Sequence, residues 1–155
     1  MESNDYVQNL VEIVNTADRR IFIASEQLPE EYYGRSEVVD AITKAIGRGV
    51  SVCILTGPEH KSIPPHSDLT EIYITPYIPE VNFVVGVSKD NSLLSHLGFL
   101  PSHKHDVLLS SGEEGIGEVY RRKCDPVVGS YLLYRFTEAT RKLKPSSLNP
   151  QALPH

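Results

Sequence analysis

Hydrophobic positions near the start of the chain follow two different patterns, a helical spacing and a continuous run. In residues 4–17 apolar side chains recur every three or four positions, which predicts an amphipathic helix with Asn4 as its N-cap. Residues 20–25 form a short, nearly continuous apolar run, which is typical of a strand buried on both faces. We therefore expect a surface helix followed by a central strand.

The same two patterns return in residues 36–55. Ser36 is a suitable N-cap for a helix whose apolar positions have helical spacing, and two glycines close that helix. Residues 50–55 are again a continuous apolar run. Residues 20–55 thus predict a strand, a helix and a second strand, the unit that joins two parallel strands by a crossover.

Three further segments are rich in β-branched, aromatic or other apolar residues and predict additional strands. They are residues 71–77, 81–87 and 106–110. Segments that show neither the helical spacing nor an apolar strand pattern are expected to be loops or turns. They are residues 29–34, residues 57–67, the turn at 89–91 that leads into 92–97, and the glycine-rich acidic segment 112–118.

The last predicted element is a helix that begins at Asp125 and Pro126, a capping carboxylate followed by proline at the first helical position. Its apolar stripe has helical spacing and consists of Val128, Leu132, Phe136, Ala139 and Leu143. After Lys144 the periodicity is lost. We therefore expect one domain over residues 1–144 and a mobile tail over residues 145–155.

Composition narrows the class of protein. The chain has 155 residues, of which 40% are hydrophobic and 23% charged, enough apolar mass for one core and too much for a disordered or fibrous protein. The acidic N-terminus lacks the features of a secretory signal, and the two distant cysteines form neither a disulfide framework nor a four-ligand metal site. We expect a cytoplasmic protein without a resident metal or cofactor, in which Cys53 is a structural thiol.

Part of this pattern also carries a family resemblance. The sequences RIFIAS at residues 20–25 and SEVVDAITKAIGRGVSVCILTG at residues 36–57 resemble the opening half of a phospholipase D-like domain. The resemblance implies an α/β fold, a single α-β-α sandwich with a mixed sheet. By analogy with catalytic relatives, in which two such units build one site, it also implies a homodimer.

Catalytic members of that superfamily carry a His-x-Lys-x4-Asp motif, in which histidine attacks phosphorus and lysine neutralises the phosphoryl oxygens. The corresponding strand here has Asn82, Val84 and Lys89 at the three positions, so no phosphohistidine can form there. Neither His60 nor His103 begins another copy of the motif, because a lysine follows each of them directly. The resemblance therefore implies a domain with a degenerate active site.

Non-catalytic relatives of this fold serve as ligand-sensing domains in sugar-responsive transcription regulators and as lipid-binding or recruitment modules in membrane traffic. We accordingly expect a non-catalytic binding or regulatory module that holds a small anionic or polyol ligand or a partner protein. Ligands of open α/β sheets bind beyond the carboxyl ends of the strands. The expected ligand-binding residues are Ser25, Glu26, Thr56, Gly57 and Asn82. The alternative is that Ser25 only ends its strand and that Gly57 and Pro58 only turn the chain. Tyr32 and Tyr33 either stack on a ligand or cover the core.

An enzyme is the first alternative. A divergent phosphodiesterase or nuclease would act through relocated histidines, with a lysine offering positive charge to the phosphate; the candidates are His96, His103, His105 and Lys104. This alternative predicts that the histidines converge with Lys61 or Lys89. The same segment could supply two imidazoles and Asp106 to a metal, with His60, His66 or His96 as a third ligand, although a solvated loop is the simpler interpretation.

A lipid-surface or trafficking adaptor is the second alternative. Residues 121–144 carry seven basic and two acidic residues, a net charge of +5, whereas the rest of the chain carries −10. Arg121, Arg122 and Lys123 would then meet an anionic membrane. A nucleic-acid partner is compatible with the same charge but is not favoured, because cations near the end of a helix complement its dipole without any ligand.

Overall fold

The computed structural model describes residues 3–62, 69–76, 81–89, 97 and 103–145. The predicted connection over 90–96 and nearly all of the predicted tail lie outside the described residues. The helices are α1 (Ser3–Thr16), α2 (Glu30–Tyr33), α3 (Ser36–Gly47) and α5 (Pro126–Thr140). The strands are β1 (Arg20–Ser25), β2 (Ser51–Thr56), β3 (Glu71–Ile74), β4 (Val81–Lys89), β5 (His103–Ser111) and β6 (Val119–Arg122).

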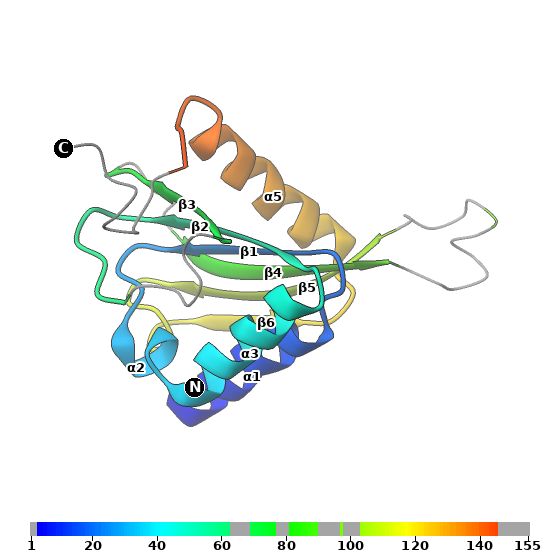
Figure 1. Cartoon of the computed structure of the whole chain (residues 1–155), viewed down its shortest axis with the longest axis horizontal. Helices are drawn as coiled ribbons and strands as arrows, with labels where there is room; N and C mark the ends of the chain where they lie inside the picture. Colours follow the sequence, from blue (N-terminus) through cyan, green and yellow to red (C-terminus); the bar gives the residue numbers. More distant parts are fainter. Residues whose placement is uncertain (1–2, 63–68, 77–80, 90–96, 98–102, 146–155) are drawn as a thin grey trace.

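The six strands form one mixed sheet in the order β3-β2-β1-β4-β5-β6. Strands β1, β2 and β3 run parallel, whereas β4, β5 and β6 each run antiparallel to the preceding neighbour in the sheet. Helices α1 and α3 cover one face of the sheet and α5 covers the other (Figure 1). The predicted α/β sandwich with a mixed sheet and a parallel β1–β2 pair is therefore confirmed.

Alternating residues of the central strands build two apolar layers. One layer packs the inward stripes of α1 and α3 on side chains such as Ile23, Ile54 and Val84. Gly86 of β4 lets α1 approach this face closely, because a Cβ there would lie 2.8 Å from Cγ2 of Ile13. The sequence pattern of short apolar runs reflects this burial of the strands on both sides.

The second layer lies under α5. Phe136 of this helix makes edge contacts with Phe22 and Phe83, at ring-centroid distances of 5.2 and 6.5 Å. The predicted N-cap is confirmed, since Oδ1 of Asp125 accepts a hydrogen bond from the backbone N–H of Val128 at 3.0 Å. Capping at one end and aromatic packing along one stripe place α5 across β1, β4 and β5.

Some predicted boundaries are wrong. Helix α3 begins at Ser36, so Arg35 occupies the N-cap position, and no side chain caps that end. The segment expected to be a loop at 29–34 contains the short helix α2, and β6 was not predicted at all. Strand β6 is four residues long and lies at the edge of the sheet, so it has no long alternating pattern to reveal it. Within the described residues no helix is long and apolar enough to cross a membrane.

The close approach of α1 to the sheet can be tested at Gly86. Substitution Gly86→Ala should lower the free energy of unfolding by about 1–3 kcal/mol, because the added methyl group overlaps Ile13 and Ala17. Gly47→Ala is the matched control, since nothing lies within 4 Å of a Cβ at that position. Urea denaturation of both variants checks the prediction, and equal stabilities would contradict it.

Candidate functional site

The carboxyl ends of β1 and β2 meet at one edge of the sheet. Ser25 and Thr56 are opposite each other in the register, and both are buried. Just beyond them, the backbone N–H of Gly57 donates to the carbonyl oxygen of Glu26 at 2.9 Å. A Cβ at Gly57 would lie 2.8 Å from that oxygen, so glycine is required for this close approach. Four of the predicted ligand-binding residues are therefore together.

Asn82, the fifth predicted residue, lies at the same edge because β4 runs antiparallel to β1. Its Oδ1 accepts a hydrogen bond from the backbone N–H of Glu26 at 3.0 Å. Its Nδ2 donates to the carbonyl oxygen of Gly112 at 3.2 Å. Asn82 therefore ties the segment after β1 to the loop after β5, and both ends of its amide are occupied by backbone groups.

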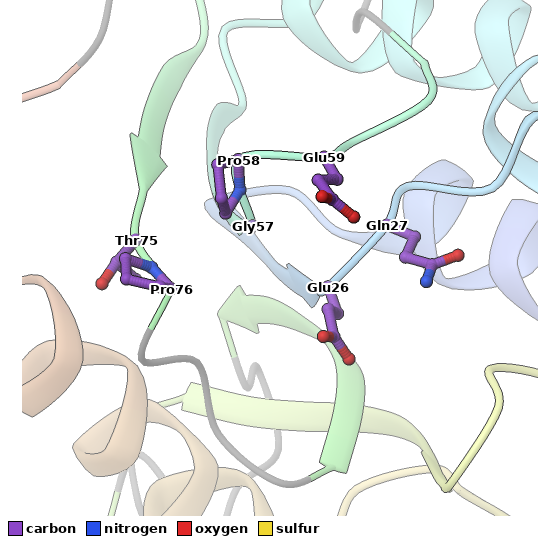
Figure 2. A pocket seen from close by; sticks show the side chains of 7 residues that line it. All are labelled: Glu26, Gln27, Gly57, Pro58, Glu59, Thr75 and Pro76. Atoms are coloured by element: carbon purple, nitrogen blue, oxygen red, sulfur yellow. The ribbon is translucent and has the colours of Figure 1, made fainter.

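Two adjoining hollows open at this edge, and we call them together the strand-end groove. The first has a volume of about 190 Å³ and lies between the residues that follow β1, β2 and β3 (Figure 2). It is lined by Glu26, Gln27, Gly57, Pro58, Glu59, Thr75 and Pro76. The second has a volume of about 530 Å³ and shares Glu26 and Gln27 with the first. Its other lining residues are Pro29, Glu31, Asn82, Gly112, Glu113 and Glu114.

The lining of the strand-end groove is acidic. Five glutamates line its two hollows, and among the described lining residues there is no lysine or arginine. Lys61 lies nearby, in a shallower hollow that also includes Glu30 and Glu31. The groove can therefore accept hydrogen bonds from hydroxyl or ammonium groups, whereas an anion would face a repulsive surface.

Glu114 forms the buried floor of this site. Its carboxyl group accepts hydrogen bonds from the hydroxyl groups of Ser25, Tyr6 and Tyr33, at 2.5, 3.0 and 3.1 Å. Burial raises the pKa of Glu114, and the three hydroxyl donors offset part of that rise. Burial and the nearby Glu114 carboxyl also raise the pKa of Tyr6 and of Tyr33.

Sequence reasoning missed Glu114 and placed it in a flexible acidic loop. The available signal was the pair of flanking glycines, since Gly112 and Gly115 both have positive φ and shape the turn that carries Glu114 inward. The structure also decides between the two interpretations of the tyrosines. Tyr32 and Tyr33 are 1% and 5% exposed, so they cover the core and offer no stacking surface.

The positions that correspond to the catalytic motif hold no catalytic group. Asn82 is bonded to backbone at both ends of its amide, and Val84 is fully buried against the α1 layer. Lys89 is exposed at the other end of β4. It lies seven positions along the strand from Asn82, about 23 Å at the usual rise per residue.

The histidines of β5 lie at that distant end of the sheet. His103 is opposite Lys89 in the register, while the groove end of β5 is at Ser110 and Ser111. His103 and His105 thus approach Lys89 but not Lys61, and Lys104 points to the other side of the strand. His66 and His96 lie outside the described residues.

A metal site at these histidines also finds no support in the structure. Asp106 is on the opposite side of β5 from the two imidazoles, where its carboxylate accepts hydrogen bonds from the Cys124 backbone and from Thr16. Within the described ranges, no group of three or more His, Cys, Asp or Glu side chains is arranged to hold a metal ion.

The basic residues after β5 are engaged with acidic partners. Arg121 and Lys123 both pair with Glu12 of α1, at 3.2 and 2.8 Å. Tyr120 and Asp125 raise the pKa of Arg122, so this guanidinium also has favourable neighbours. Of the three cations expected to meet a membrane, Arg121 and Lys123 therefore contact α1, while Arg122 and Lys123 are exposed.

Comparison with known proteins identifies the fold. No family model matches the sequence, and no curated protein matches it. TrmBL2, an archaeal chromatin protein described as showing a novel mode of DNA binding, is similar in structure with a TM-score of 0.55 and 14% identity. The match covers 94% of this chain and 51% of TrmBL2, so the chain spans about half of that protein's length.

Two bacterial structures are similar over most of both chains. NucT from Helicobacter pylori matches with a TM-score of 0.51 and 14% identity, covering 94% of this chain and 93% of NucT. Nuc from Salmonella typhimurium, a phospholipase D family member, matches with a TM-score of 0.48 and 10% identity over 88% of each chain. At these identities the similarity shows the fold alone, and the α/β fold with a mixed sheet that the sequence predicts is confirmed.

The buried carboxyl group leads to a prediction about pH. Because the folded state raises the pKa of Glu114, the resulting stabilisation is complete below its ordinary value of 4.5 and is lost as pH rises through the folded pKa. Relative to Glu114→Gln, the wild type should therefore lose free energy of unfolding as pH rises above about 4.5. Urea denaturation across this range checks the slope. The exposed neighbour provides the control, since Glu113→Gln should keep the wild-type slope.

Proposed function

We propose that this chain is a non-catalytic binding module whose strand-end groove holds a small polyhydroxylated ligand. The observation that carries the proposal is the lining of the groove, in which carboxylates are abundant and described cations are absent. Such groups accept hydrogen bonds from hydroxyl groups, which are the donors that a polyol presents. Of the ligands expected from the sequence, the acidic lining favours the polyol over the anion.

The absence of catalytic chemistry from the motif positions supports a binding role. Asn82 and Val84 take the places of the nucleophile and the lysine, and neither is a nucleophile or a cation. Both are also committed to the fold, one through backbone hydrogen bonds and the other through burial. The histidines of β5 lie far from the groove, which gives the alternative of a relocated phosphodiesterase site less support.

Location also supports the proposal. In open α/β sheets ligands bind beyond the carboxyl ends of the parallel strands, and the groove lies at the ends of β1, β2 and β3. Its walls come from four connections between elements, and hydrogen bonds at Asn82 and Gly57 hold three of these in place. A groove that is already shaped loses little conformational entropy when a ligand binds.

Ligand-dependent thermal unfolding tests the proposed ligand class. Maltose and myo-inositol should raise the thermal midpoint, whereas inorganic phosphate should not, because only the polyols donate hydrogen bonds to the carboxylates. Glu26→Ala should weaken polyol binding about tenfold, the effect of losing a hydrogen bond to a charged group.

The matched control is Glu118→Ala, which removes an exposed carboxylate outside the groove lining and should leave polyol binding unchanged. A shift produced by phosphate and not by polyols would overturn the proposed ligand class. Equal weakening by both substitutions would show that the polyols bind elsewhere.

Catalysis is tested separately. Purified protein should hydrolyse neither bis(p-nitrophenyl) phosphate nor single-stranded DNA above background, with or without added divalent metal, because no histidine is among the described lining residues of the groove. Hydrolysis that disappears in His103→Ala or His105→Ala would overturn the non-catalytic proposal and assign the reaction to the other end of the sheet.

A further inference from the structure

The first turn of α5 rests directly on His105 of β5. The backbone N–H of Asp125 donates to the carbonyl oxygen of His105 at 2.8 Å. The imidazole packs so closely on Gly129 that a Cβ added to this glycine would lie 2.8 Å from Nδ1 of His105. The half-buried ring therefore fills the space between the strand and the helix.

The position of the ring favours its neutral form. Nδ1 of His105 is buried and makes no hydrogen bond. A proton there would add a buried donor and a charge at the positive end of the α5 dipole. Burial and the neighbouring His103 lower the pKa of His105 from its ordinary value of 6.5, and the backbone of Pro126 offsets only part of this effect.

The charged side chains around the ring are mostly basic. The register and the alternation of strands place four basic residues on the same side of the sheet: His103 on β5, Lys89 on β4, Arg122 on β6 and Arg20 on β1. From α5 the facing acid is Asp125, whose carboxylate already accepts hydrogen bonds from Tyr120 and Val128. Lys104 and Asp106 are on the other side of β5. A protonated ring would therefore meet more repulsion than attraction.

We propose that His105 is an acid-sensitive joint, at which protonation of the ring in mildly acidic solution releases the first turn of α5 from β5. Release would uncover the apolar layer that α5 protects, which includes Phe22 and Phe83. Because this joint is at the end of the sheet opposite the strand-end groove, it operates whether or not the groove binds a polyol.

The direction of the pH effect follows from linkage. A ring that leaves its buried position regains a pKa near 6.5, whereas the docked ring has a lower one. Docking of α5 is therefore fully stabilised above about pH 6.5, and this stabilisation is lost as pH falls through the pKa of the docked ring.

Amide hydrogen exchange of the full chain tests the joint at pH 7.5 and pH 5.0, after correction for intrinsic exchange rates. Protection of the first-turn amides of α5, including Val128 and Gly129, should be lower at pH 5.0 than at pH 7.5, because protonation favours the released ring. In His105→Asn, which cannot titrate, protection of the same amides should be equal at the two pH values within about twofold.

His103→Asn is the comparison variant on the same strand. It removes one of the two causes that lower the pKa of His105, so the dependence on pH should be retained while its midpoint moves to higher pH. If His105→Asn lowers the overall stability, His105→Phe supplies a second non-titrating variant that retains a ring against Gly129. Persistence of the acid effect in both His105 variants, or its loss in the His103 variant, would overturn the proposal. Uniform loss of protection across all elements would do so as well.

Discussion

The carboxyl group of Glu114 is buried where four segments of the chain meet. Its three hydroxyl donors come from α1, from the end of β1 and from α2, while Glu114 itself belongs to the loop after β5. A buried carboxyl group is costly to desolvate unless such partners are present, so these segments must adopt compatible positions together. The shape of the strand-end groove depends on these contacts, because the loop that carries Glu114 also forms one of its walls.

Asn82 extends the same constraint to the neighbouring backbone. In catalytic members of the superfamily that the sequence resembles, the corresponding position holds the attacking histidine, whereas here an amide joins two loops. A position that reacts must be free to change its partners, and one that cross-links backbone is not. Asn82 thus serves the fold at this edge, while the glutamates that line the groove supply its hydrogen-bond acceptors.

The two ends of the sheet differ in chemistry. Glutamates line the groove end of the sheet, whereas Lys89, His103 and His105 lie at the other end, near the start of α5. In the basic segment after β5, Arg121 and Lys123 pair with Glu12 of α1. Arg121 is 12% exposed and orients the edge strand against the helix, whereas Lys123 is 70% exposed and its pair is screened by solvent.

The sequence by itself determined the central architecture. The apolar runs at 20–25 and 50–55 and the helical stripe between them predict a parallel pair with its crossover, because strands buried on both faces need continuous apolar residues. Asp125 and Pro126 likewise predict the start of α5, since capping depends on local chemistry. The residues at the ends of these strands were therefore predicted to lie together. Only the tertiary structure decided that Glu114 turns inward, that β6 joins the edge, and that the histidines of β5 are far from the groove. Those features depend on contacts between residues as many as 109 positions apart, which no local pattern of hydrophobicity records.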